Sequence, residues 1–82
     1  MNSFHYVYIL KSEADEGHHY TGLTKDLKVG LKDHNRGQVP HTSKHLPWQI
    51  QTAIAFRSYE KAAEFEKYLK SNSGRAFARK HF

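Results

Sequence analysis

The 82-residue sequence contains no cysteine, and this absence excludes several classes of protein. A disulfide scaffold, an iron–sulfur site, a cysteine-based zinc knuckle and a thiol nucleophile all require cysteine. A secreted domain of this size usually needs disulfides, so we expect a cytoplasmic protein. The longest apolar run, roughly Tyr6 to Leu10, is far shorter than the roughly 20 residues of a membrane span, and the N-terminus lacks a signal-peptide pattern. We therefore expect a globular protein with no membrane partner.

Acidic residues are missing from the last part of the chain. Residues 1–66 hold eight basic and eight acidic side chains, whereas residues 67–82 hold five basic ones and no acid. The net charge of +5 therefore arises from the C-terminal segment. Such a segment is typical of a surface that binds polyanions, and also of a solvated basic face that keeps a small protein soluble.

The length predicts a single domain, residues 1–82, and the sequence pattern predicts three strands in it. Aromatic and β-branched residues indicate strands at 4–10, 18–23 and 48–57. A polar loop joins the first two strands into a hairpin. Gly22 in the second strand predicts either a bulge or a close approach of another group to the backbone.

Three helices complete the predicted fold. The first, residues 27–35, begins after Thr24 or Asp26 as N-cap and ends near Gly37, which suits a left-handed position. Ser58 caps the second, residues 59–70, and a Ser-Asn-Ser-Gly stretch separates it from a third at 75–80. The order ββαβαα predicts an α+β fold, a three-stranded antiparallel sheet flanked by helices on one or both faces.

Two polar residues fall on apolar helix faces, and both have more than one explanation. Glu66 lies within a stripe formed by Tyr59, Ala62, Phe65 and Leu69. A carboxylate there is costly unless it is paired, hydrogen-bonded or bound to a metal, and a rim position or an ion pair with a basic neighbour also explains it. His34 aligns with Leu27 and Leu31, and such a residue is more often a hydrogen-bonded core histidine than a catalyst.

Four further residues are ambiguous for similar reasons. Tyr8 and Tyr20 lie in predicted strands, where most aromatic rings are core. His41 and His45 are four apart, a spacing that two metal ligands use on a helix. Two prolines flank them and the sequence places no third ligand nearby, so a polar loop that contacts phosphate is favoured.

Taken together, these segments resemble the GIY-YIG nuclease superfamily, and in particular its small, single-domain bacterial members. The resemblance covers residues 6–80. It rests on Val7-Tyr8-Ile9 and Tyr20-Thr21-Gly22, on Asp26-Leu27 followed by Leu31, His34-Asn35 and Gly37, on the basic loop before Pro47-Trp48, and on the segment from Ala62 to Lys70. Each short motif is weak alone, whereas the ordered set is specific.

The resemblance implies a fold, an activity and a set of site residues. Family members have a three-stranded antiparallel sheet flanked by helices and hydrolyse phosphodiester bonds in nucleic acids with one divalent cation, here Mg²⁺ or Mn²⁺, and no small-molecule cofactor. By position, Glu66 is the expected metal-binding carboxylate. Tyr8 is expected to assist activation of the nucleophile, Tyr20 to line the same pocket and His34 to hydrogen-bond within it.

One position departs from the family pattern. Family members carry an arginine four residues before the helix histidine, where it contacts the scissile phosphate, and here that residue is Gly30. Losing such a clamp can lower the rate of phosphoryl transfer by orders of magnitude. Three explanations remain open: an inactivating substitution, a natural binder without catalysis, or partial compensation by Lys28, Lys32 or Arg36.

We therefore expect an endonuclease domain that cuts DNA, with single-stranded or structured DNA as plausible substrates, and as alternative a non-catalytic nucleic-acid-binding module on the same fold. A protein-interaction domain is a third hypothesis. Exposed tyrosines or Trp48 could stack bases. The sequence does not indicate an oligomeric state. The expected phosphate contacts are Lys28, Lys32, Arg36, His41, Lys44, Lys67, Lys70, Arg75, Arg79 and Lys80.

Overall fold

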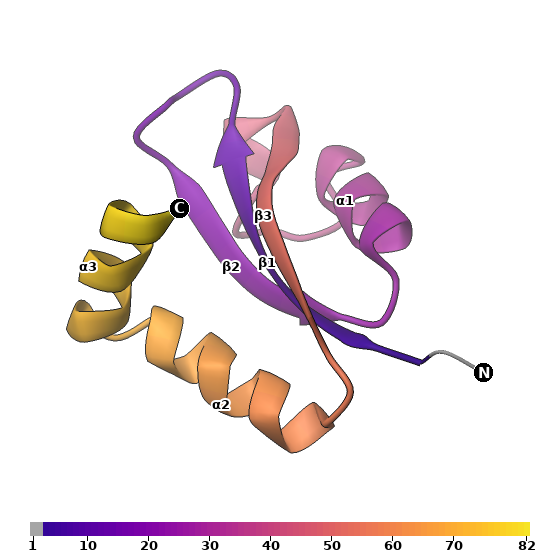
Figure 1. Cartoon of the computed structure of the whole chain (residues 1–82). Coiled ribbons are helices and arrows are strands. Elements are labelled where there is room, and N and C mark those ends of the chain that lie inside the picture. Colours follow the sequence, from indigo (N-terminus) through magenta and orange to yellow (C-terminus); the bar gives the residue numbers. More distant parts are fainter. Residues whose placement is uncertain (1–2) are drawn as a thin grey trace.

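The computed structural model describes residues 3–82 and has the predicted α+β order (Figure 1). In chain order the elements are β1 (His5–Ser12), β2 (His19–Thr24), α1 (Leu27–Asn35), the short 3-10 helix η1 (Ser43–His45), β3 (Trp48–Phe56), α2 (Tyr59–Leu69) and α3 (Asn72–His81). Within residues 3–82 no helix is both long and apolar enough to cross a membrane.

The three strands form one antiparallel sheet in the order β2-β1-β3, so β1 is central. Tyr8 pairs with Gly22 of β2 and with Ala53 of β3. The register of β1 against β3 shifts between Ile9 and Leu10. Because side chains alternate along a strand, Tyr8 and Leu10 point to one face of the sheet and Val7 and Ile9 to the other.

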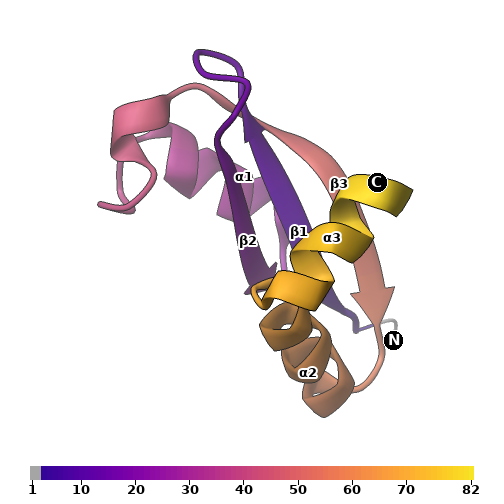
Figure 2. The ribbon, with the colours of Figure 1, turned by 90° about the vertical axis from the view of Figure 1, so that its left-hand side faces the viewer.

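Helices cover both faces of the sheet, and each face has its own core (Figure 2). On one face Tyr8, Leu10 and Trp48 are buried against leucines of α1 and of the loop before β3. On the opposite face Val7 and Ile9 are buried against Ala62 and Leu69 of α2, with phenylalanines of α2 and α3 around them. The central strand therefore contributes to two separate apolar clusters, and its alternate residues belong to different sides of the molecule.

The ends of α1 are those that the sequence predicts. The Asp26 side chain accepts a hydrogen bond from the Val29 backbone N–H at 3.2 Å, and Gly37 after the helix has φ +75°. Asn35 fixes the end of α1 to β3, because its amide donates to the Trp48 carbonyl at 3.0 Å and accepts from the Trp48 N–H at 2.6 Å. These contacts hold α1 against the face that carries Tyr8.

The predicted break before the last helix is wrong, because α3 begins at Asn72 and includes Gly74. Ser71 is the N-cap, and its hydroxyl accepts a hydrogen bond from the Gly74 N–H at 3.1 Å. A Cβ at position 74 would collide with the Tyr68 carbonyl at the end of α2. Gly74 therefore allows α3 to pack tightly against α2, and the polar stretch is the start of a helix.

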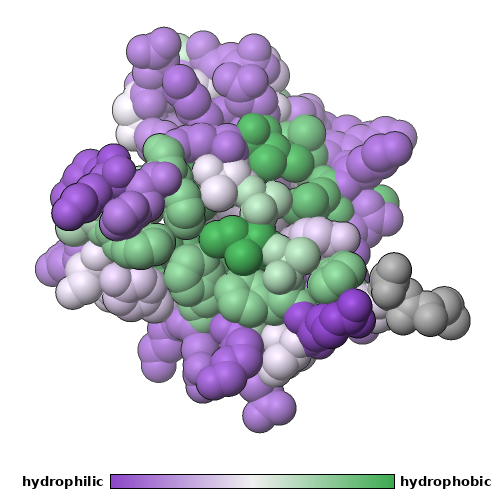
Figure 3. Space-filling view, viewed as in Figure 1, coloured by the Kyte–Doolittle hydropathy of each residue, from purple (hydrophilic) through white to green (hydrophobic). Residues whose placement is uncertain are grey.

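Apolar side chains also reach the surface. In the view of Figure 1 they gather over the middle of the molecule, around β3, and polar side chains surround them (Figure 3). Ile50 of β3 and Val29 of α1 are among the exposed large hydrophobic residues. Tyr59 was predicted to belong to the apolar stripe of α2, but it is 58% exposed, so this stripe begins at Ala62.

Candidate functional site

The centre of the candidate site is a hydrogen-bonded chain of three side chains between β1, α1 and the loop before η1. Tyr8 Oη lies 3.0 Å from His34 Nε2, and His34 Nδ1 lies 2.8 Å from Thr42 Oγ1. All three residues are buried, with His34 only 3% exposed. The histidine that the sequence places on an apolar helix face therefore has a partner on each ring nitrogen.

The hydrogen bonds define which nitrogen of His34 carries the proton. The Thr42 hydroxyl donates to the Val39 carbonyl at 3.2 Å, so its oxygen accepts from the His34 Nδ1–H. His34 Nε2 then has a free lone pair and accepts the Tyr8 hydroxyl proton. Burial lowers the pKa of His34 from its ordinary value, although the nearby Asp33 charge opposes this effect. Both observations favour the neutral imidazole.

Tyr8 is held in its protonated form by the same surroundings. Burial raises the pKa of its phenol to about 12, and the nearby Tyr20, Glu66 and Asp33 contribute further. Glu66 of α2 is thus one of the smaller causes of this raised pKa, although α2 covers the other face of the sheet. Tyr8 is thus a neutral hydrogen-bond donor to His34 near neutral pH.

Tyr20 completes an aromatic cluster around His34. Its ring centroid lies 4.6 Å from that of His34 and 6.3 Å from that of Tyr8. Gly22 makes this packing possible, because a Cβ there would lie 2.6 Å from Tyr8 Cζ and 2.9 Å from Tyr20 Cε2. Of the two predictions made for Gly22, the close approach is correct.

Glu66 lies at the rim of the core. Its side chain is 22% exposed, and its carboxylate is 3.1 Å from Lys70 Nζ, one helical turn later. This is the ion pair with a basic neighbour that the sequence left open as an explanation. The carboxylate is reachable from solvent, which is compatible with a binding role.

Gly30 precedes His34 by about one turn of α1, on the same side of the helix. A Cβ there would meet only Thr24 side-chain atoms, at 3.6 Å and beyond, which is ordinary contact. A Cβ is therefore tolerated at position 30, and no steric contact of that Cβ requires glycine there. Lys28, Lys32 and Arg36 on and after the same helix are exposed.

The basic residues expected to contact phosphate are all exposed. They do not form one surface, because they are divided between the two sides of the sheet. His41 and Lys44, with the basic residues of α1, lie on the Tyr8 side, whereas Lys67, Lys70, Arg75, Arg79 and Lys80 belong to α2 and α3. A groove of about 790 Å³ brings Lys70, Arg75 and Arg79 together with Tyr20. Tyr20 lines this groove on the α2 side of the sheet and also packs on His34 of the other side.

Sequence reasoning missed one residue of the site and misassigned another. Thr42 is 1% exposed and orients His34, but as a threonine in an irregular loop it has no periodicity that would identify it. Trp48 cannot stack bases as suggested, because its ring is buried and its Nε1–H donates to the Thr42 carbonyl at 2.9 Å. Its role is to support the loop that carries Thr42.

The fold is an antiparallel sheet between helices, and one face of the sheet carries a tyrosine–histidine–tyrosine cluster. Both features agree with the class of small α+β domain that the sequence resembles. A family model for the GIY-YIG catalytic domain matches residues 4–80, so the chain belongs to the GIY-YIG family. This family is of nuclease type. The resemblance inferred from the short motifs is therefore confirmed.

Several similar proteins carry the name UPF0213. The chain is 35% identical to the UPF0213 protein SAG0778 of Streptococcus agalactiae over 72 residues, which are 87% of this chain and 80% of that protein. It is 33% identical to a UPF0213 protein of Haloquadratum walsbyi over 87% of this chain and 79% of that protein. The solution NMR structure of the UPF0213 protein BH0048 from Bacillus halodurans has a TM-score of 0.56 and 34% identity, covering 93% of this chain and 80% of that one.

Proposed function

We propose that this chain is an endonuclease domain that hydrolyses phosphodiester bonds in DNA, including single-stranded or structured DNA, with the help of one divalent cation. The observation that supports this best is the Tyr8–His34–Thr42 chain of hydrogen bonds with Tyr20 packed beside it. Together with the family membership, this arrangement favours proton transfer as the task of the cluster.

The geometry suggests how these residues would handle a proton. A water that donates to Tyr8 Oη can transfer its proton to that oxygen as the phenol proton moves to His34 Nε2. The imidazolium formed keeps its Nδ1–H on Thr42, so the ring does not need to turn. Because the Tyr8 pKa is raised to about 12, Tyr8 acts through His34 rather than as a free phenolate.

The residues present fit a hard divalent cation at Glu66. Mg²⁺ binds through one or two carboxylates and keeps several waters, and Glu66 offers one accessible carboxylate whose present partner is a single flexible lysine. A bound cation supplies Lewis-acid stabilisation of charge on a phosphate. Glu66 would hold it.

DNA binding would rely on phosphate contacts in the basic groove. Lys70, Arg75 and Arg79 line it, and Tyr20 forms part of its wall next to His34. The groove is on the α2 side of the sheet, with Ile9 and Leu69 in its wall, so a strand held there would reach the proposed site only at the Tyr20 edge of the sheet. Such binding weakens steeply with salt, because each neutralised phosphate releases counterions.

The alternative, a nucleic-acid-binding module without catalysis, is favoured by Gly30 alone. This position lacks the expected arginine, and no contact of the glycine explains its presence. Under this alternative the chain binds DNA in a salt-dependent way, needs no metal and cuts nothing.

A cleavage assay on three forms of the protein separates these two functions. The wild type, Gly30→Arg and Gly30→Ala would be incubated with labelled single-stranded, double-stranded and branched DNA, with Mg²⁺, with Mn²⁺ and with chelator. We expect metal-dependent cleavage by Gly30→Arg, at least tenfold faster than by Gly30→Ala, which controls for helix stability. Binding by all three forms without any cleavage would favour the binding module and contradict the proposal.

A further inference from the structure

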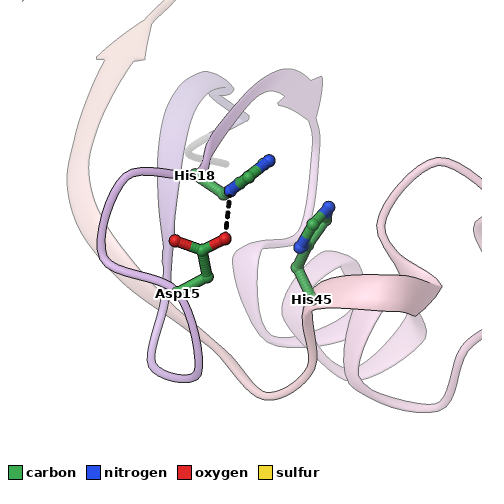
Figure 4. A group of neighbouring side chains, drawn as sticks. All are labelled: Asp15, His18 and His45. Atoms are coloured by element: carbon green, nitrogen blue, oxygen red, sulfur yellow. Dashed lines mark ion pairs between the residues drawn. The ribbon is translucent and has the colours of Figure 1, made fainter.

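Three side chains of types that commonly ligate metals, from two loops, lie close together (Figure 4), at the end of the sheet away from α2 (Figure 1). Asp15 and His18 lie in the loop between β1 and β2, and His45 is the last residue of η1. One ligand atom from each side chain lies within 4.8 Å of the others. This was not foreseen from the sequence, which offered His41 as the partner of His45.

The three side chains are close enough together to share one ion, although the two rings are not oriented toward a common point. His18 Nδ1 is 2.7 Å from Asp15 Oδ2, and the His18 and His45 rings stack with centroids 3.8 Å apart and an interplanar angle of 20°. Donor atoms around one tetrahedral Zn²⁺ lie roughly 3.4 Å apart, given Zn–N and Zn–O bonds of about 2.0–2.2 Å. Because imidazole lone pairs lie in the ring plane, two stacked rings cannot both point at one ion, so binding requires the His18 and His45 rings to rotate about their χ angles. Both side chains are at least partly exposed to solvent.

A buried hydroxyl holds the two loops in this position. Ser12 Oγ donates to the His45 carbonyl at 2.7 Å and accepts from the Asp15 N–H at 3.0 Å, and the Ser12 side chain is fully buried. A backbone hydrogen bond of 2.9 Å from the Glu13 N–H to the Pro47 carbonyl adds a second link. The hairpin loop and the segment around η1 are thus connected before any ion binds, which lowers the entropic cost of forming a site.

The set of donors determines which ions would bind. Two imidazoles and one carboxylate suit Zn²⁺ and related divalent transition metals, whereas Mg²⁺ prefers oxygen ligands alone. Asp15 Oδ1 already accepts from the Gly17 N–H at 3.3 Å, which leaves Oδ2 as the ligating oxygen. Asp15 and His18 are each half exposed on the surface, so an ion can reach them directly.

We propose that Asp15, His18 and His45 form a second metal site, which binds one Zn²⁺-class ion and clamps the hairpin loop to η1. The site is independent of the cation proposed at Glu66, since it uses different residues and a different class of metal. Its ion would also restrain the segment that begins with Thr42, the residue that orients His34. The role is therefore structural, and it supports the loop on which the Tyr8–His34 pair depends.

Zn²⁺ titration of the tag-free protein tests this proposal without any nuclease assay. We expect one Zn²⁺ per chain by calorimetry and a higher melting temperature with Zn²⁺ but not with Mg²⁺. His18→Gln and His45→Gln should each raise the dissociation constant at least tenfold. His19→Gln and His41→Gln are matched controls, because both residues are exposed histidines next to the site in sequence but outside the group, and Glu66→Gln is the control for the other cation.

A measurement on the wild type alone guards against variants that fold poorly. In an NMR titration that follows the histidine imidazole resonances, the signals of His18 and His45 should shift at lower Zn²⁺ concentrations than those of His19 and His41. The proposal is overturned if no stoichiometric Zn²⁺ binding occurs, or if His19 and His41 respond while His18 and His45 do not. Equal affinity of the His45→Gln variant and the wild type would also overturn it.

Discussion

Tyr8 of the central strand and His34 of α1 are 26 residues apart in the chain and share a buried hydrogen bond of 3.0 Å between Oη and Nε2. The bond determines the protonation of both groups, because a neutral imidazole accepts and a neutral phenol donates. On the other side of the imidazole ring, Thr42 accepts a hydrogen bond from the His34 Nδ1–H. The proposed chemistry depends on this relationship, so it can be tested one partner at a time.

Replacing Tyr8 by phenylalanine should separate catalysis from folding. The ring keeps its packing in the α1-side core, but the buried His34 Nε2 loses its only partner, which costs about 1–3 kcal/mol of unfolding free energy. DNA cleavage by the active form, whether wild type or Gly30→Arg, should fall by about 100-fold or more, as expected when a group in the proton-transfer path is lost. Tyr6→Phe in the same strand is the control, and equal loss in both variants would argue against a special role for Tyr8.

Thr42→Val tests whether the loop before η1 orients the histidine. The change keeps the shape of the side chain but removes the acceptor of the His34 Nδ1–H, which leaves a buried donor unpaired. Urea unfolding should show a loss of about 1–3 kcal/mol. Thr42→Ser keeps the hydroxyl and should restore most of the stability. If Thr42→Ser is as unstable as Thr42→Val, packing of the methyl group matters and the hydrogen bond does not.

His34 should make stability depend on pH below neutrality. Burial lowers its pKa in the folded state, so the unfolded chain, where the ordinary value is 6.5, binds the proton more readily. The stabilising contribution is therefore complete above about pH 6.5 and is lost as the pH falls through the folded pKa. Unfolding free energies measured from pH 7.5 to pH 5 should fall more steeply for the wild type than for His34→Gln. Parallel curves would mean that His34 does not prefer its neutral form.

Two glycines should respond to alanine in opposite directions. At Gly22 the added Cβ would lie 2.6 Å from Tyr8 Cζ, so Gly22→Ala should destabilise the fold by about 1–3 kcal/mol. At Gly30 the nearest Thr24 atoms are 3.6 Å away, so Gly30→Ala should stabilise α1 by about 1 kcal/mol. Urea unfolding of both variants measures this, and a change of the same sign in both would show that the local contacts do not decide the outcome.

The fold was predictable wherever local chemistry determines the backbone. The α1 helix has a capping aspartate, an apolar face and a terminal glycine, and its bounds match the prediction of residues 27–35. The start of α3 was mispredicted because Ser-Asn-Ser-Gly is read as a turn from sequence. Its helical state depends on the approach of Gly74 to the Tyr68 carbonyl, a contact between two helices that no local pattern contains.

The candidate site was predictable only through residues that belong to a motif. Tyr8, Tyr20 and His34 came from the ordered set of short motifs, and the structure brings these three together. Thr42 and the Asp15–His18–His45 group lie in loops, where their meeting depends on how the chain folds back on itself. The division of basic residues between the two sides of the sheet was equally hidden, since it follows from the positions of α1 and α3.

Glu66→Gln in the form that cleaves DNA, whether wild type or Gly30→Arg, tests the central claim most directly. Glu64→Gln is the matched control, because Glu64 is an exposed carboxylate on the same helix with its own lysine partner, Lys61. Both variants would be compared for Mn²⁺-dependent cleavage and for melting temperature. We predict that Glu66→Gln remains folded and loses cleavage by at least 100-fold while Glu64→Gln keeps it. Cleavage by Glu66→Gln at the unmutated rate would contradict the account.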